Sequence, residues 1–374
     1  MKNEARNTLP ADLPSRRDFM LGGSVLGLGA AATGLVGCSE AGQSSGADAD
    51  AGTMGDRRLF NGLSAETSEV YPFEYKELEI NGRRIHYVDE GSGPTVMLLH
   101  GQGNWSYHYR GVINRLKDRA RVVCHDHQGS GLSEQPAFHR QYTIENHIST
   151  LYGVIEALDL RGITFYCMDW GGPISFAYST ANPDNMRGLV IGNTWAWGEH
   201  SPFLRSAGWR ARHQPVVRPL WGRLRRDTPP RLSRPNPGGD WDTPAAHEVA
   251  RYDRRYSENS ETRSMGFNRS TQASSDHPLE YLQRTARTFA QIEAGLPGLQ
   301  HLPVRVLSPE NDPAFPPEDQ ERWRELFPNA PPVIRIPDSG HVGQASELGA
   351  DLIAGAIGEV LDEAVQMESV GGVI

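Results

Sequence analysis

The segment from residue 163 to residue 173 most constrains what this chain can fold into. Ile163–Met168 is mostly apolar and predicts a buried strand, and Gly171-Gly172-Pro173 predicts the start of a helix. Asp169 is the polar residue at the turn between them, with the small residues Cys167 and Gly171 two positions to either side. A sharp strand-turn-helix of this kind presents one side chain above the sheet. We therefore expect a nucleophile elbow with Asp169 at its apex. The alternative is that Asp169 only caps the helix.

The identity of the presented residue predicts the chemistry. A carboxylate is already ionised at neutral pH, so it can displace a leaving group from saturated carbon and become an ester. Water can then attack the carbonyl carbon of that ester if a base removes its proton and donors stabilise the oxyanion. Asp169 is accordingly the predicted nucleophile.

Strand-like and helix-like segments alternate from residue 75 onward, which is typical of a mostly parallel sheet with helices on both faces. The first two strands are joined by Asn81-Gly82 and predict an antiparallel hairpin. The alternation stops over residues 195–297, which we interpret as a helical cap inserted into a core formed by residues 58–194 and 298–374. The predicted strands are Tyr75–Ile80, Arg84–Glu90, Thr95–Leu99, Ala120–Cys124, Ile163–Met168, Gly188–Ile191, Val304–Leu307 and Val333–Ile336. The predicted helices are Tyr107–Lys117, Ile144–Leu158, Pro173–Ala181, Glu318–Leu326 and Leu348–Val360.

A base and an acid follow the elbow in chain order. His341 lies in a Ser-Gly-His turn after the last predicted strand and is the candidate base. Asp312 follows the preceding strand and is the candidate acid that orients His341 and stabilises its charged form. Glu310, two residues earlier, is the alternative acid. The order of nucleophile, acid and base is the one used by α/β-hydrolases.

Four motifs together resemble the haloalkane dehalogenases of the α/β-hydrolase superfamily, over about residues 75–347 and least in the cap. They are Asp169–Ile174, Gly192–Trp197, His100-Gly101 with Trp105–Arg110, and Asp312–Phe315. The resemblance implies an α/β-hydrolase fold with an eight-stranded, mostly parallel sheet and an inserted helical cap. It also implies a hydrolase that converts haloalkanes and water to alcohols and halide ions, without cofactor or metal.

The same resemblance implies a halide site. Its donors are the indole N–H of Trp170 and a side-chain amide from the first loop. The family usually has Asn and Pro after His-Gly, whereas this chain has Gln102-Gly103, and Asn104 is a second candidate for halide or oxyanion support. The alternative for Trp170 is a core aromatic residue. Main-chain N–H groups of Gln102 and Trp170 would form the oxyanion hole.

Two other functions are compatible with the motifs. An epoxide hydrolase resembles this family in its Asp-Trp-Gly elbow and uses cap tyrosines as proton donors, for which Tyr252, Tyr256 and Tyr281 are candidates. A non-catalytic surface lipoprotein that kept the fold is the second. Intact Asp169 and His341 argue against loss of activity.

The N-terminus predicts export and a lipid anchor. Ser15–Met20 resembles a twin-arginine motif, an apolar Gly/Ala-rich run follows to Gly37, and Leu35–Cys38 resembles a lipobox. We therefore expect a signal over residues 1–37, lipidation of Cys38, a flexible tether over residues 38–57, and a periplasmic or cell-surface protein held at the membrane by that anchor. The alternative for the apolar run is a membrane-spanning helix.

The charge of the chain limits the kinds of partner it can have, and the position of its cysteines indicates their role. The net charge is −9 and almost all the positive charge is arginine, which does not favour a nucleic-acid partner. We expect a small halogenated substrate and water instead. Cys124 and Cys167 end apolar runs and are predicted to be buried core residues rather than a disulfide.

Overall fold

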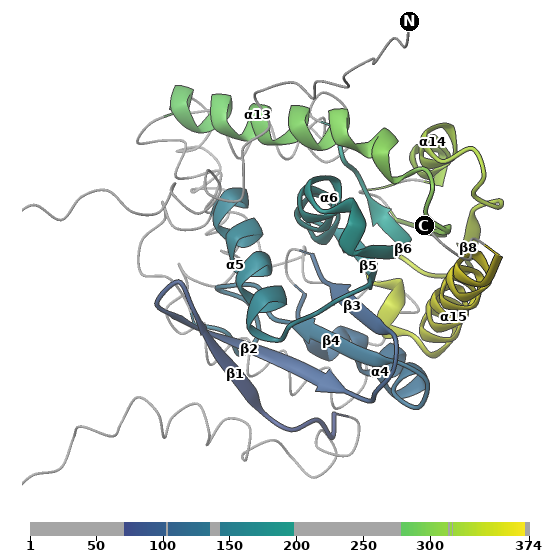
Figure 1. Cartoon of the computed structure of the whole chain (residues 1–374), viewed down its shortest axis with the longest axis horizontal. Coiled ribbons are helices and arrows are strands. Elements are labelled where there is room, and N and C mark those ends of the chain that lie inside the picture. Colours follow the sequence, from purple (N-terminus) through teal and green to yellow (C-terminus); the bar gives the residue numbers. More distant parts are fainter. Residues whose placement is uncertain are drawn as a thin grey trace, which may run out of the picture. The chain divides into compact units, whose positions relative to one another are not determined.

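The protein is described from a computed structural model that covers residues 71–101, 104–134, 143–197, 278–312, 315 and 317–370 (Figure 1). These residues all belong to one compact unit, Ser64–Ile374. No helix within these ranges is both long and apolar enough to cross a membrane. The predicted signal, lipidation site and tether lie outside the described residues.

One eight-stranded sheet organises this unit, in the order β1-β2-β4-β3-β5-β6-β7-β8. The β1–β2 and β2–β4 pairs are antiparallel and every other pair is parallel. The predicted eight-stranded, mostly parallel sheet is therefore confirmed. The strands are β1 (Lys76–Ile80), β2 (Arg83–Glu90), β3 (Thr95–Leu99), β4 (Arg121–His125), β5 (Ile163–Asp169), β6 (Met186–Thr194), β7 (Val304–Pro309) and β8 (Ile334–Ile336).

The antiparallel start is set by the turn between β1 and β2. Asn81 and Gly82 have φ values of 55° and 70°. Two consecutive positive φ angles fit the right-handed twist of a two-residue hairpin, and Asn-Gly adopts them at low cost. The predicted hairpin is confirmed.

Helices cover both faces of the sheet. In Figure 1, α5, α6 and α13 lie on one side of the strands, and α4 and α15 lie on the other. The α-helices are α4 (Arg110–Leu116), α5 (Ile144–Ala157), α6 (Gly171–Ala181), α13 (Pro278–Gly295), α14 (Pro317–Leu326) and α15 (Glu347–Val370). The 3₁₀ helices are η1 (Ser106–Tyr109), η3 (Pro183–Asn185), η6 (Leu296–Leu299) and η7 (Gly343–Ala345).

Several predicted boundaries differ from the structure, and among the helices two differ by three residues or more. The last helix runs to Val370 instead of Val360, because no glycine or proline interrupts the chain between Glu359 and Gly371. The predicted helix from Tyr107 begins instead as the 3₁₀ helix η1 and becomes α-helical at Arg110. Neither change moves a candidate site residue.

The core is centred on the parallel strands. Every residue of β3 and β5 is buried, as their mostly apolar sequences predict. Cys124 and Cys167 are buried free thiols, so the prediction of core cysteines is confirmed. Of the predicted cap, the structure describes residues 195–197 and 278–297, where α13 packs against α6. The cap boundaries remain a prediction.

Candidate active site

Asp169 occupies a strained turn at the carboxyl end of β5. Its φ is 47°, in the left-handed region that non-glycine residues rarely adopt, and the residue is 5% exposed. The turn is possible because two residues packed closely against it, Gly171 and Gly101, lack side chains. A Cβ at Gly171 would collide with the Leu99 carbonyl, and one at Gly101 would collide with the Asp169 carboxylate. The structure thus gives Asp169 the backbone of an elbow rather than that of an ordinary helix cap.

Thr194, at the end of β6, holds this turn from the neighbouring strand. Asp169 and Thr194 are register partners, and the Thr194 hydroxyl donates to the Asp169 carbonyl at 2.5 Å. The Thr194 carbonyl in turn accepts from the indole N–H of Trp323 at 3.3 Å and from the Gln320 amide at 3.4 Å. Several elements therefore fix the main chain that carries Asp169.

His341 and Asp312 come together with Asp169 from two other loops. His341 Nε2 lies 3.8 Å from Asp169 Oδ2, and His341 Nδ1 lies 2.9 Å from Asp312 Oδ2. The second Asp312 oxygen accepts from the main-chain N–H of Phe315 at 3.2 Å. Glu310, the alternative acid, is exposed, and its carboxylate accepts from the main-chain N–H of Asp338. Asp312 is the carboxylate that contacts the histidine.

The electrostatic environment favours the charged form of His341. Burial by itself lowers the pKa of this histidine, but the attraction and hydrogen bond of Asp312, together with the nearby Asp169, outweigh burial and raise the pKa to about 9. The His341 side chain keeps 27% of its surface exposed. The Phe315 ring stacks on the imidazole at a centroid separation of 5.7 Å. Aromatic packing and the carboxylate together fix the orientation of the imidazole.

Asn193 is a member of this site that the sequence analysis did not identify as one. Its side-chain N–H₂ donates to Asp312 Oδ2 at 2.5 Å and to the His341 carbonyl at 2.9 Å. Both amide hydrogens are then used, which ties the acid to the loop of the base. The available signal was a buried amide near the end of an otherwise apolar strand.

The predicted halide donors are only partly described. Trp170 is 5% exposed and its indole meets that of Trp195 edge-on, with centroids 5.0 Å apart. Gln102 lies outside the described residues. Asn104 is 3% exposed, and its side-chain amide lies 3.5 Å from the sulfur of Met168, the residue before the nucleophile. Asn104 is therefore close to the elbow, and the thioether that its amide contacts is a weak acceptor.

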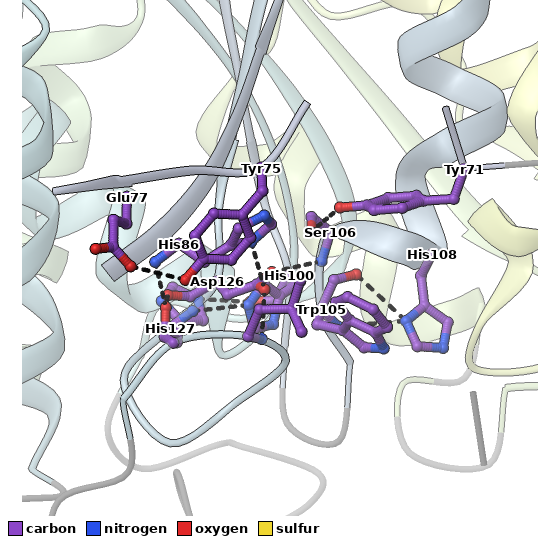
Figure 2. A network of polar contacts seen from close by, with 12 residues as sticks. Tyr71, Tyr75, Glu77, His86, His100, Trp105, Ser106, His108, Asp126 and His127 are labelled. Atoms are coloured by element: carbon purple, nitrogen blue, oxygen red, sulfur yellow. Dashed lines mark hydrogen bonds and ion pairs between the residues drawn. The ribbon is translucent and has the colours of Figure 1, made fainter. Parts of the chain in front are cut away.

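A buried histidine pair holds the loop that follows β3 (Figure 2). The main-chain N–H of His127 donates to His100 Nε2 at 3.0 Å, so the proton of His100 is on Nδ1, which donates to the Gly101 carbonyl at 2.9 Å. His127 Nε2 donates to the His100 carbonyl at 2.9 Å. Burial, and next to it the charge of His127, keep the pKa of His100 well below its usual value. His100 is thus neutral and fixes the start of the loop that carries Gln102.

Asp126 organises the adjacent loop in the same network. It lies 2.9 Å from His86 Nδ1 and accepts from the main-chain N–H groups of Ser106 and Leu132 at 2.8 and 2.9 Å. Burial raises the pKa of this carboxyl, but the attraction and hydrogen bond of His86, together with further contributions that include the Leu132 N–H, outweigh burial and bring the pKa down to about 2. Among the described residues, no group of three or more His, Cys, Asp or Glu is arranged to hold a metal ion.

The sequence matches the family model described as "alpha/beta hydrolase fold" over residues 94–348. It is 43% identical over 129 residues to haloalkane dehalogenase 2 of Mycobacterium tuberculosis, covering 34% of this chain and 45% of the relative. It is 37% identical over 130 residues to a cis-3-alkyl-4-alkyloxetan-2-one decarboxylase of Shewanella oneidensis, covering 34% of this chain and 41% of the relative. The chain thus spans less than half the length of these relatives.

Solved structures share the fold at lower identity. The haloalkane dehalogenase DbeA of Bradyrhizobium elkani superposes with a TM-score of 0.60 at 19% identity, over 77% of this chain and 99% of that one. An epoxide hydrolase of Vigna radiata superposes with a TM-score of 0.56 at 20% identity, over 78% of this chain and 99% of that one.

Proposed function

Because this chain belongs to the α/β-hydrolase fold family, we propose that it uses its elbow carboxylate to hydrolyse the carbon–halogen bond of haloalkanes, giving an alcohol and a halide ion. The observation that carries the proposal is the position of His341 Nε2, 3.8 Å from a carboxylate held where this fold presents its nucleophile. Similarity to a haloalkane dehalogenase supports the choice of substrate class.

In the first step an oxygen of Asp169 attacks the carbon that bears the halogen. The new C–O bond forms as the C–X bond breaks, and the halide leaves with the bonding electron pair. The indole N–H of Trp170, together with an amide from Gln102 or Asn104, is proposed to receive that anion. Gly101 supports this step because its missing side chain leaves room around the carboxylate.

In the second step His341 removes a proton from water, and the resulting hydroxide attacks the carbonyl carbon of the Asp169 ester. The bond between the carbonyl carbon and the ester oxygen then breaks, so the alcohol departs with the oxygen that Asp169 supplied and takes the proton from the imidazolium. The oxygen of water stays in the Asp169 carboxyl group, which loses its proton to solvent. Asp312, 2.9 Å from Nδ1, stabilises the imidazolium. The attached alkyl group also neutralises Asp169, which removes one of the charges that raise the His341 pKa. The ester therefore makes His341 a more available base at neutral pH.

Epoxides and oxetan-2-ones are two further candidate substrate classes. The same nucleophile can open an epoxide, although two of the candidate cap tyrosines, Tyr252 and Tyr256, and the side chain of Tyr281, lie outside the described residues. A cis-3-alkyl-4-alkyloxetan-2-one, named for one relative, is a strained ring that a carboxylate can also attack. A chain without activity is the remaining possibility.

The deciding experiment measures the products formed by the purified full chain from three substrate panels. These are bromo- and chloroalkanes, epoxides, and 3,4-dialkyl-oxetan-2-ones. We expect halide release that is lost in Asp169→Asn and kept in Asp338→Asn, an exposed aspartate with a similar φ of 52°. Diol from the epoxides, or alkene from the oxetan-2-ones, without halide release would reassign the substrate class. No product from any of the three panels would favour the non-catalytic lipoprotein.

We also propose that Cys38 anchors this activity to a membrane after twin-arginine export. The supporting features are the paired Arg16 and Arg17, and the apolar run that ends at Cys38. We expect the protein in the membrane fraction and a diacylglycerol adduct on Cys38 by mass spectrometry of the mature N-terminus. A Cys38→Ala chain that is found in the membrane fraction like the native chain, and that migrates like it in gel electrophoresis, would contradict the lipid anchor.

A further inference from the structure

Two tryptophans follow the ends of neighbouring parallel strands beside the nucleophile. Asp169 on β5 and Thr194 on β6 are register partners, and Trp170 and Trp195 are the residues that directly follow them. Their indole centroids are 5.0 Å apart, with an interplanar angle of 75°. In sheets of this kind, ligands bind beyond the carboxyl ends of the strands. Trp195 therefore lies at the edge where the substrate of Asp169 is expected.

Trp195 buries a hydrogen-bond donor that has no acceptor among the described residues. The residue is 1% exposed, and its Nε1 atom is fully buried with no hydrogen-bond partner in the described part of the chain. The neighbouring Trp323 is equally buried, yet its Nε1 donates to the Thr194 carbonyl at 3.3 Å. Buried donors are satisfied in the great majority of cases, and an indole N–H can only donate. The unmatched donor points to an acceptor supplied from outside the described chain.

Two phenylalanine rings stack on the indole that carries this donor. Phe315 stacks on the Trp195 indole at 5.4 Å and Phe289 at 6.1 Å. Phe315 also stacks on His341 at 5.7 Å, so one aromatic row connects Trp195 to the catalytic histidine. An apolar enclosure of this kind suits a large, weakly hydrated anion better than a strongly hydrated one. A halide such as bromide has that character.

We propose that the indole N–H of Trp195 is a second donor of the halide site and receives the departing halide together with Trp170. The inference rests on the proposed function, because that function supplies the anion. It names a residue of this chain for the role that Gln102, outside the described residues, would otherwise fill. The role is electrostatic, because the halide leaves carbon with the bonding electron pair and the indole N–H donates a hydrogen bond to the negative charge that develops on it.

The test compares the affinity for bromide of the full native chain, Trp195→Phe and Trp197→Phe. Phenylalanine keeps an aromatic ring and removes the N–H. Trp197 is a matched control because it lies two residues after Trp195 and is also buried, with its ring against that of Trp323. Bromide affinity is measured from the rise of Tm with bromide at constant ionic strength and from inhibition of turnover by bromide. We expect Trp195→Phe to weaken bromide binding about 10-fold or more, the loss typical of a hydrogen bond to a charge, and Trp197→Phe to leave it unchanged.

A second measurement does not depend on the variant folding. Crystals of the native chain soaked in bromide are expected to place the anomalous bromine peak in contact with the Nε1 atoms of Trp170 and Trp195. A peak on Trp170 and away from Trp195, or an unchanged affinity in Trp195→Phe, would overturn the role of Trp195 and leave the proposed function standing. A native chain that binds no bromide and releases none from any haloalkane would overturn both.

Discussion

Two aspartate–histidine pairs in this molecule have the same separation of 2.9 Å and different surroundings. In one, Asp312 contacts His341, whose side chain is 27% exposed and whose far nitrogen faces Asp169. In the other, Asp126 contacts His86, both side chains are fully buried, and the carboxylate also holds two main-chain N–H groups. The contact itself therefore does not distinguish a catalytic base from a histidine with a structural role. Access to the far nitrogen and a third reacting group do.

Protonation also differs between the two regions. Carboxylates outweigh burial at His341 and raise its pKa to about 9, whereas at His127, in the buried network that includes Asp126 and His100, burial dominates and lowers the pKa to about 4. Substitutions in the two regions should consequently affect different properties of the protein, namely turnover in the first and stability in the second.

Removing the nucleophile should have the largest effect. Asp169→Asn is nearly isosteric but replaces an ionised carboxylate with an amide, so halide release should fall at least about 10⁴-fold. Stopped-flow or steady-state halide assays measure the loss, and a far-UV spectrum and Tm close to native show that the fold is kept. Residual turnover within 10-fold of native would rule out ester formation on Asp169.

Asp312→Asn should reduce turnover about 10³-fold, because the imidazolium loses its stabilising charge. The same change removes a cause of the raised His341 pKa, so the neutral base forms at lower pH. The rising limb of the pH–rate profile should therefore move to lower pH while its plateau falls. A profile that keeps its midpoint would mean that Asp312 does not set the charge of His341.

Asn193→Ala should have an intermediate effect. It removes one donor from Asp312 and one from the His341 carbonyl, and the loss of a hydrogen bond to a buried charge predicts a decrease in kcat of about 10- to 100-fold. Asn193→Gln, which keeps the amide, serves as the comparison. Equal kcat values for Ala and native would make Asn193 a bystander.

Asp126→Asn should have the smallest effect on turnover and a large one on stability. Breaking a fully buried pair typically costs about 3–5 kcal/mol, while the folded fraction keeps its kcat within about threefold. Chemical denaturation and turnover per folded molecule separate the two quantities. A loss of kcat comparable to that of Asp312→Asn would erase the distinction between the pairs.

Local patterns predicted the sheet and three of the site residues. Continuous apolar strands, the Asn81-Gly82 turn and the isolated Asp169 are each explained by residues close in sequence. Asn193 was missed because its two partners, Asp312 and the His341 carbonyl, belong to loops more than 100 residues away. Trp195 lies within the Gly192–Trp197 motif, but that its indole N–H has no acceptor among the described residues is visible only in the folded structure.

The covalent ester on Asp169 is tested most directly by trapping it. His341→Gln removes the base for the second step and leaves the first step intact, so one equivalent of bromide should be released from a bromoalkane and then stop. Intact-mass spectrometry should show the mass of one alkyl group added to the chain, and peptide mapping should locate it on Asp169. Continued turnover by this variant without an adduct, or an adduct on another residue, would contradict an Asp169 nucleophile served by His341.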